Sequence, residues 1–503
     1  MSPRSLLLRD VRPIGLDDDA AGPPDLVDVL VEAGMIRQVA AGLTAPADVP
    51  VVDGGGRFVA PGLWDHHVHL EQWALQQVRL DTAGTSSVDE VVALLRDHIA
   101  QLGEGDPGSV VHAWGHRSAG WSRRGTAAEL DAVCGSHPVV LISGDGHHGW
   151  LSSSALRRLG LPTGEGTGVV EEAEWFAAYA RLTEVFGPDP HLEDGLRLAL
   201  EDAAARGVVG IVDLEFSGSY GPWPDRVARG LDTLRVVTAT YEDGLDDVVG
   251  RGLRTGDPLG DSGLVTMGPL KIISDGSLNT RTAFCCAPYG GGGDHGVQNY
   301  PPERLREVAA RAHAAGLECA VHAIGDAAVR DALDAFEATG ARGSLEHAQL
   351  VRWQDVPRMA ALRLRASVQP AHLLDDRDVT ETCWGDRTDR CFALRAMADA
   401  GVRLALGSDA PVSPLDPWLA MAAAVHRSAD ERGAWHPEQA LTVREAFAAS
   451  VDGQRVTRGA RGDLVLLDAD PTVWHGDSAE VGARLRGLRP TLTVVAGRVV
   501  HGA

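Results

Sequence analysis

One repeating unit dominates the chain between about residues 85 and 425: an amphipathic helix, a glycine that ends it, a short apolar run, and a polar residue where the run ends. For example, a helix starting at Pro302 ends near Gly316, and the apolar run Leu317–Val321 leads directly into His322. Repetition of this unit predicts parallel strands joined by helical crossovers, which is an α/β fold. Barrels of this class often exceed ~250 residues in one domain, so the length of 503 residues fits.

The two ends of the chain carry a different pattern, in which short β segments alternate with turns. These segments are Ser5–Val11, Leu26–Val31, Met35–Val39, Asp463–Leu467 and Leu492–Val500, the last two separated by a polar stretch around Trp474–Asp477. We expect them to join into one small β-sandwich beside a central barrel. The predicted domains are therefore 1–60 plus 451–503 for the composite sandwich, and 61–450 for the barrel.

Composition and charge exclude several classes of protein. A formal net charge of −24 disfavours phosphate backbones and anionic membrane surfaces as partners. No stretch approaches the ~20 consecutive apolar residues of a membrane span. Six cysteines without a CxxC pair are typical of reduced thiols. We expect a cytoplasmic protein that binds neither nucleic acid nor membranes, takes a small-molecule substrate, and has an acidic surface that permits a homodimer.

The first chemical pattern is a pair of histidines after a Pro-Gly turn, His67 and His69. In a strand, residues i and i+2 face the same way, so both imidazoles project together while His66 faces away. Two imidazoles on one face can chelate one metal ion. The alternative is a pair of half-buried core histidines, and His66 is expected to be a core residue.

Three further polar residues come directly after strand-like runs: His322, His347 and Asp409. In a parallel barrel the carboxyl ends of the strands converge on one face, where active sites are built. Four imidazoles and one carboxylate from four strands therefore predict a metal site.

Lys271 lies inside an apolar run between Leu270 and Ile272. Burial lowers the pKa of a lysine unless a partner holds its charge. A neutral amine can add carbon dioxide, and the resulting carbamate can bridge two metal ions. The alternative is a lysine that pairs with Asp275 or a neighbouring acid.

An ordered set of motifs extends from about residue 4 to the C-terminus. The motifs are Pro61-Gly62 followed by Asp65, His67 and His69; Lys271 followed by DGSL at 275–278 and RTA at 281–283; HAIGD at 322–326; EHAQ at 346–349; Gln369-Pro370-Ala371-His372; and GSDAP at 407–411. Together they resemble the amidohydrolase superfamily, and within it the metal-dependent hydrolases similar to N-substituted formamide deformylase. The resemblance implies a (β/α)8, TIM-like barrel with a composite β-sandwich.

The same resemblance implies a centre of one or two divalent metal ions, most simply zinc, although manganese or iron would fit the ligands. The implied roles are His67 and His69 on the first metal, His322 and His347 on the second, Lys271 bridging as its carbamate, and Asp409 binding metal and moving protons. Asp65 is expected to orient its neighbours rather than bind the metal.

Substrate contacts are implied for a second group of residues: His147, Trp150, Arg281 and His372. His147 and Trp150 lie in a DGHHGWLSS segment that resembles a substrate-side motif of the family, but His148, Gly149 and Ser152 depart from it. Arg281 either orients substrate or anchors a loop. His116 is a weaker candidate for a substrate contact.

The chemistry of these groups predicts a hydrolase that cleaves a non-peptide C–N bond, such as that of an N-substituted formamide, a small amide or a cyclic amide. Metal-activated hydroxide would attack the carbonyl, with Asp409 as the proton shuttle. The alternatives are a single-metal deaminase or an ester or lactone hydrolase on the same scaffold, and a non-catalytic scaffold protein. Metal content discriminates among them.

Overall fold

The computed structural model describes residues 5–16, 25–102, 110–118, 121–135, 137–144, 146, 148–164, 168–216, 220–290, 292–428 and 430–502. The chain divides into two compact units, Met1–Leu70 with Leu200–Ala503, and Glu71–Ala199. The domain boundaries predicted from the sequence did not anticipate the second unit, which lies within the range 61–450.

The larger unit contains a sheet of eight described strands, all parallel to their neighbours, in the order β18-β17-β16-β15-β14-β13-β12-β6. The strands are β6 (Leu63–Val68), β12 (Val208–Asp213), β13 (Arg235–Thr240), β14 (Val265–Ile273), β15 (Cys319–Ala323), β16 (Gly343–His347), β17 (Arg365–Val368) and β18 (Arg403–Leu406). The two ends of this sheet meet, because a parallel bridge joins Val68 to Ala410. The predicted α/β class with a (β/α)8-type barrel is therefore confirmed.

Helices follow these strands in turn, as the repeating sequence unit requires. They are α8 (Trp223–Ala228), α9 (Leu245–Gly250), α10 (Pro302–Ala314), α11 (Asp326–Thr339), α12 (Val356–Ala361), α13 (Leu373–Cys383), α14 (Leu394–Asp399), α15 (Pro417–His426), α16 (Val443–Ala448) and α17 (Ser478–Gly487). In α11 the residues Ala328, Ala332 and Phe336 are buried at a spacing of four, and Gly340 ends the helix in a left-handed conformation. Helix α11 thus buries one apolar stripe.

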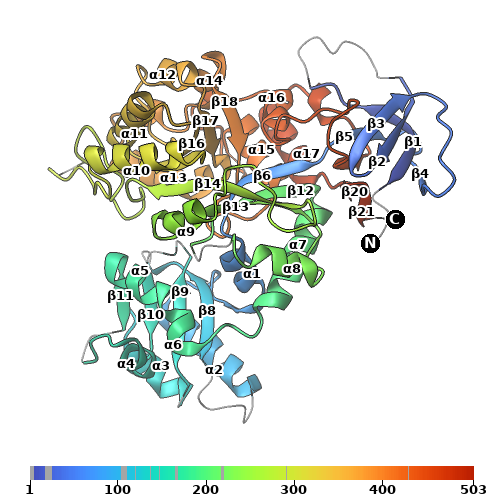
Figure 1. The fold of residues 1–503 in the computed structure, drawn as a ribbon. Coiled ribbons are helices and arrows are strands. Elements are labelled where there is room, and N and C mark those ends of the chain that lie inside the picture. Colours follow the sequence, from blue (N-terminus) through green and yellow to red (C-terminus); the bar gives the residue numbers. More distant parts are fainter. Residues whose placement is uncertain are drawn as a thin grey trace. The chain divides into compact units, whose positions relative to one another are not determined.

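A second sheet of eight described strands joins the two termini, as expected (Figure 1). It consists of β1 (Leu6–Pro13), β2 (Val27–Glu32), β3 (Met35–Ala40), β4 (Val51–Asp53), β5 (Phe58–Pro61), β19 (Leu464–Leu467), β20 (Leu492–Val495) and β21 (Arg498–His501). The run predicted as one strand, Leu492–Val500, is two strands, because Ala496 and Gly497 both take positive φ and form a hairpin turn. Helix α17 follows the polar stretch that ends at Asp477.

The smaller unit has its own five-stranded sheet among its described residues, in the order β11-β10-β9-β8-β7. Its elements are β7 (Leu80–Asp81), α2 (Val88–Leu102), β8 (Val111–His116), α3 (Ala127–Cys134), β9 (Val139–Ser143), β10 (His148–Leu151), α4 (Ser153–Leu159), β11 (Val169–Glu171), α5 (Glu172–Ala180) and α6 (Leu182–Phe186). The boundaries of the unit fall in α1 (Leu70–Val78) and α7 (Leu192–Ala205). Trp150 and Trp175 are fully buried in its core.

Two further observations concern the whole described chain. None of its described helices combines the length and apolar character that crossing a bilayer requires. All six cysteines are free, as the absence of CxxC pairs predicted.

Candidate metal centre

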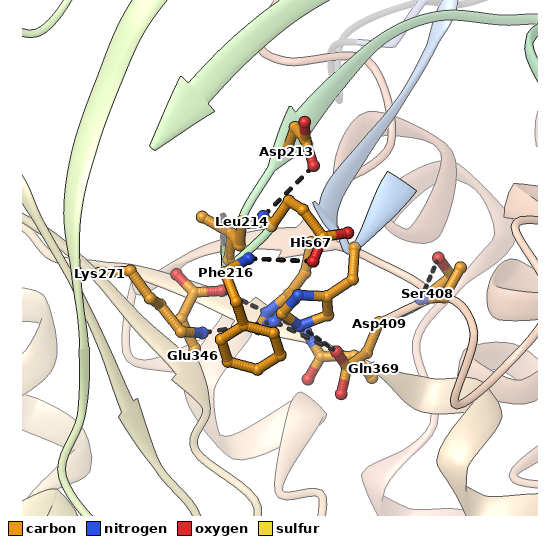
Figure 2. A network of polar contacts seen from close by, with 12 residues as sticks. His67, Asp213, Leu214, Phe216, Lys271, Glu346, Gln369, Ser408 and Asp409 are labelled. Carbon is orange, nitrogen blue, oxygen red and sulfur yellow. Dashed lines mark hydrogen bonds and ion pairs between the residues drawn. The ribbon is translucent and has the colours of Figure 1, made fainter. Parts of the chain in front are cut away.

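His67 stands at the centre of a network of buried polar groups at the carboxyl ends of the barrel strands (Figure 2). Its Nδ1 donates to Glu346 Oε2 at 2.8 Å. Its Nε2 lies 3.3 Å from Lys271 Nζ and 3.2 Å from Asp409 Oδ1. Because Glu346 accepts the Nδ1 proton, Nε2 is left as the lone-pair nitrogen, and this nitrogen faces the other candidate ligands.

Glu346 lies at the penultimate position of β16 and is 2% exposed. Burial alone would raise the pKa of this carboxyl, but the hydrogen bond from His67 and the charge of Lys271 bring it down to about 2. Ser344 Oγ, two residues earlier on the same face of the strand, donates to Glu346 Oε1 at 2.5 Å. The carboxylate is therefore ionised and fixed, and it orients the ring of His67.

Asp409 follows β18 and contacts histidines from two other elements. Its Oδ1 lies 3.4 Å from His69 Nε2, and its Oδ2 lies 3.8 Å from His372 Nε2. Its backbone N–H donates to His67 O at 2.7 Å, and its φ of 58° is left-handed. Burial opposes ionisation of this carboxyl, but the neighbouring imidazoles of His67 and His69 hold its pKa well below the usual range.

The segment before Asp409 is held against β6 by Asp65. Asp65 Oδ1 accepts from the backbone N–H groups of His67 at 3.1 Å and Ser408 at 2.9 Å. Gly407 makes this approach possible, because a Cβ there would lie 2.9 Å from the His67 backbone nitrogen. Asp65 thus holds the segment around Ser408 against β6, and its orienting role at a metal centre stays a prediction.

His322 and His347 complete the group of imidazoles. Their ring centroids are 4.5 Å apart, and the ring of His347 is 5.0 Å from that of His67. His322 Nε2 donates to Gly276 O at 3.2 Å, which leaves its Nδ1 as an acceptor. Burial lowers the pKa of both rings below the ordinary histidine value, so they are neutral and able to bind a cation.

The donor atoms fit divalent metal ions. Two groups of three have ligand atoms within 4.8 Å of one another: His67, His69 and Asp409, and His347, His372 and Asp409. Within the described residues, His69 Nδ1, His347 Nδ1 and His372 Nε2 are buried without a hydrogen-bond partner. Buried polar atoms normally have partners, and imidazole with carboxylate is a ligand set that suits zinc. Because both groups share Asp409, the arrangement suits one ion or two.

Lys271 is the only lysine in the sequence, although the chain has 46 lysine and arginine residues together. It points inward from β14 and is 2% exposed. Burial lowers the pKa of its ammonium group, against the charges of Glu346 and Asp409. The structure gives no Asp275 pairing for Lys271; Asp275 instead accepts backbone N–H groups from Phe284, Ile324 and Gly325.

One apolar side chain stands beside these ligands. The Phe216 ring stacks on His69 with a centroid distance of 4.9 Å and an interplanar angle of 16°, yet the residue is 46% exposed. Tyr241 packs against Phe216, and the centroids of the two rings are 5.4 Å apart. The Tyr241 hydroxyl donates to Leu214 O at 2.7 Å. An exposed aromatic face therefore borders the centre.

Comparison with known proteins gives the family. A family model described as the amidohydrolase family matches residues 50–501. The chain belongs to the amidohydrolase family. Among curated relatives, N-substituted formamide deformylase of Arthrobacter pascens is 27% identical over 503 residues, covering 88% of this chain and 90% of the relative. Protein LONG AFTER FAR-RED 3 of Arabidopsis thaliana is 28% identical over 484 residues, covering 85% of this chain and 80% of the relative.

A solved structure gives the same fold. The crystal structure of an uncharacterized metal-dependent hydrolase from Pyrococcus furiosus superposes with a TM-score of 0.78 at 24% identity, covering 93% of this chain and all of that one. Membership of the amidohydrolase family supports a metal-dependent hydrolase, and the predicted resemblance to this family is confirmed.

The residues predicted from the motifs divide into three groups. The predicted metal ligands of this amidohydrolase come together at one end of the barrel, and His372 joins them: His67, His69, Lys271, His322, His347 and Asp409. Arg281 is exposed, with a φ of 57°, in the loop after β14. Trp150 belongs to the smaller unit, where its Nε1 donates to Thr126 O at 3.0 Å. His147 lies outside the described residues, so the substrate roles stay predictions.

The departures from the family motif around Trp150 have structural reasons. A Cβ at Gly149 would lie 2.2 Å from the ring of Trp175, so only glycine fits there. Ser152 caps α4 by accepting from Ala155 N, and its Oγ also accepts from Val139 N at 3.0 Å. These positions serve the packing of the smaller unit. His148 Nε2 contacts Ser118 Oγ at 3.0 Å.

Sequence reasoning missed Glu346 and Gln369. Both lie within the motifs that resemble the family, but a role was predicted only for the histidines of those motifs. Gln369 Nε2 donates to Ser367 O at 3.2 Å and lies 3.5 Å from His67 Nδ1. Burying an acidic residue inside an apolar strand costs free energy, as burying a lysine does. The position of Glu346 in such a strand could therefore have identified it as a candidate.

Proposed function

We propose that this amidohydrolase cleaves a non-peptide C–N bond in a small molecule: an N-substituted formamide, a small amide or a cyclic amide. The observation that carries the proposal is the meeting of four barrel histidines, Asp409 and a buried lysine at the carboxyl ends of the strands. The formamide deformylase relative, which matches nearly the whole chain, supports this substrate class.

In this proposal His67 and His69 hold one divalent ion, most simply zinc, and His322 and His347 hold a second. When bound, such ions provide a hydroxide nucleophile near neutral pH and polarise the scissile carbonyl. Glu346 keeps His67 in the tautomer that presents Nε2, and Asp65 keeps the Asp409 segment against β6.

Asp409 moves the proton. Its carboxylate is ionised and lies near His67, His69 and His372, so it accepts the proton of the attacking hydroxide as the C–O bond forms. It then donates this proton to the departing nitrogen as the C–N bond breaks. The products are a carboxylate, which is formate for a formamide, and an amine.

Lys271 acts as a carbamate in this proposal. Its amine would add to carbon dioxide, forming an N–C bond and releasing one proton, and the carbamate would offer oxygen ligands to the metal centre. A guanidinium remains protonated and cannot do this. The retention of a single lysine, at this buried position, in a chain that otherwise uses arginine supports the assignment.

The hydrolytic test uses the full chain, depleted of metal and then reconstituted with zinc or manganese. N-benzylformamide, N-methylformamide and a cyclic amide are compared with an aryl ester, a lactone, an aminopyrimidine and an Xaa-Pro dipeptide. We expect metal-dependent release of amine from the amides, with Lys271→Arg as the matched inactive control. Faster turnover of the ester, lactone, aminopyrimidine or dipeptide would overturn the substrate class.

The carbamate is tested by ¹³C NMR after equilibration with ¹³C-bicarbonate and metal. Because Lys271 is the only lysine, one lysine carbamate resonance is expected, and Lys271→Arg removes it. A spectrum identical in both proteins would contradict the carbamate.

A further inference from the structure

Asp376 is a buried carboxylate that joins three loops at the carboxyl end of the barrel. It lies on α13 and is 6% exposed. Its Oδ1 accepts from Asn279 Nδ2 at 3.1 Å, and its Oδ2 accepts from Gln349 Nε2 at 2.9 Å. Asn279 follows β14, Gln349 follows β16, and α13 follows β17. One carboxylate therefore connects the segments after three strands.

Two of these segments lie next to a histidine of the metal centre. Gln349 comes two residues after His347, and Asp376 comes one helical turn after His372. The rings of His347 and His372 stack with a centroid distance of 6.2 Å and an interplanar angle of 26°. The hydrogen bond between Gln349 and Asp376 thus spans the same two loops as this pair of rings.

The loop after β16 needs such an anchor, because its backbone is strained. His347 and Ala348 have φ of 70° and 43°, values that residues with a Cβ rarely adopt. Gln349 is held directly after them by two bonds: its side chain donates to Asp376, and its carbonyl accepts from Phe392 N at 2.8 Å. Strained conformations persist only where the surroundings fix them.

We propose that Asp376 is a positioning residue, which sets the spacing of His347 and His372 beside Asp409 through its bonds to Gln349 and Asn279. The inference rests on the proposed function, because that function assigns His347 to the second ion and places His372 beside the proton-moving Asp409. It adds a role for a carboxylate that is neither a metal ligand nor a proton shuttle.

The test compares variants of the full chain by metal affinity, measured in competition with a chromogenic chelator, and by kcat and KM on the best amide. In Asp376→Asn the new side-chain NH2 group faces the NH2 group of either Asn279 or Gln349, so one of the two hydrogen bonds is lost. We expect metal affinity to fall by ~10–100-fold. Combining it with Gln349→Glu restores a donor and acceptor at each bond, so affinity should return to within about threefold of the parent.

Two further variants separate positioning from folding. Asp463 is equally buried but bonds to Arg235 at the terminal sheet, and Asp463→Asn should leave metal affinity unchanged. Asn279→Ala removes one bond at an exposed position and should reduce affinity by about tenfold. If Asp376→Asn fails to fold, Asn279→Ala carries the test.

Parental affinity in Asp376→Asn, or a loss that Gln349→Glu does not rescue, would overturn the inference. An equal loss in Asp463→Asn would reduce Asp376 to a general stabilising residue and would overturn it too. A parent that binds metal but hydrolyses no amide would refute the proposed function, while the metal affinities would still decide the role of Asp376.

Discussion

The carboxyl end of the barrel and the terminal sheet are both buried, but they are built from opposite kinds of residue. The core of the terminal sheet is aliphatic, with Leu8, Val29 and Leu466 among its members. The barrel end buries a lysine, a glutamate and several imidazoles, some of them without hydrogen-bond partners within the described chain. Left-handed residues lie at His347 and Asp409.

This difference separates stability from function. Aliphatic burial stabilises a fold, whereas buried charges and strained backbone cost free energy and persist where chemistry requires them. Substitutions in the terminal sheet should therefore change the free energy of unfolding, and substitutions at the barrel end should change metal binding and turnover.

Asp409→Asn should have the largest effect. It removes the carboxylate that both candidate ligand groups share, together with the proton acceptor, so we expect kcat/KM to fall by at least ~10²–10⁴-fold. The midpoint of thermal unfolding of the metal-free protein should fall at neutral pH, because the depressed pKa of Asp409 means that its ionised form stabilises the folded state. Retention of more than a tenth of the turnover would place the proton transfer elsewhere.

Glu346→Gln should have an intermediate effect. It keeps the shape of the side chain but weakens the acceptor for His67 Nδ1, and such partners are worth ~10–100-fold in metal affinity or activity. The matched control is Glu445→Gln, at the start of α16, where Glu445 pairs with Arg395. Chelator competition and initial rates measure both variants, and equal affinities would contradict the orienting role of Glu346.

Leu8→Ala should act on stability alone. Leu8 is fully buried in the terminal sheet, and such truncations cost about 2–5 kcal/mol. Urea unfolding followed by circular dichroism measures this loss. Below the unfolding transition, kcat/KM should stay within twofold of the parent. A turnover defect in the folded variant would show that the two regions are coupled.

Ile36→Val should give the smallest change. Ile36 is fully buried in β3, and loss of one methyl group costs about 0.5–1.5 kcal/mol. Metal content and turnover should equal those of the parent. Together with Leu8→Ala it shows how far the free energy of unfolding can fall before turnover decreases. A loss of metal in either variant would show that the terminal sheet also affects the metal centre.

The elements of the fold could largely be predicted, because they follow from local patterns. The helix predicted from Pro302 to near Gly316 is α10, and the apolar run that leads into His322 is largely β15. The HxH pattern predicted that His67 and His69 project together because strand geometry has a period of two, and the centroids of the two rings lie 5.6 Å apart. His66 is a buried residue, as expected.

Other features depend on contacts between distant segments, which periodicity does not report. Glu346 and His67 are 279 residues apart in the sequence and meet only when the barrel closes. The helix and strand patterns of the compact unit 71–199 are the same as those of the barrel. The sequence pattern therefore could not show that its strands form a separate sheet. His372 joins the centre because η3 (Pro370–His372) turns the chain directly after β17.

Metal content decides whether the single lysine organises a metal centre. Elemental analysis of the purified protein, of Lys271→Arg and of Leu8→Ala, each with and without bicarbonate, compares the two regions in one experiment. We predict about two divalent ions per chain in the parent and in Leu8→Ala, and one or fewer in Lys271→Arg. Equal metal content in the parent and Lys271→Arg, or no metal in the parent, would contradict a metal centre organised around the single lysine.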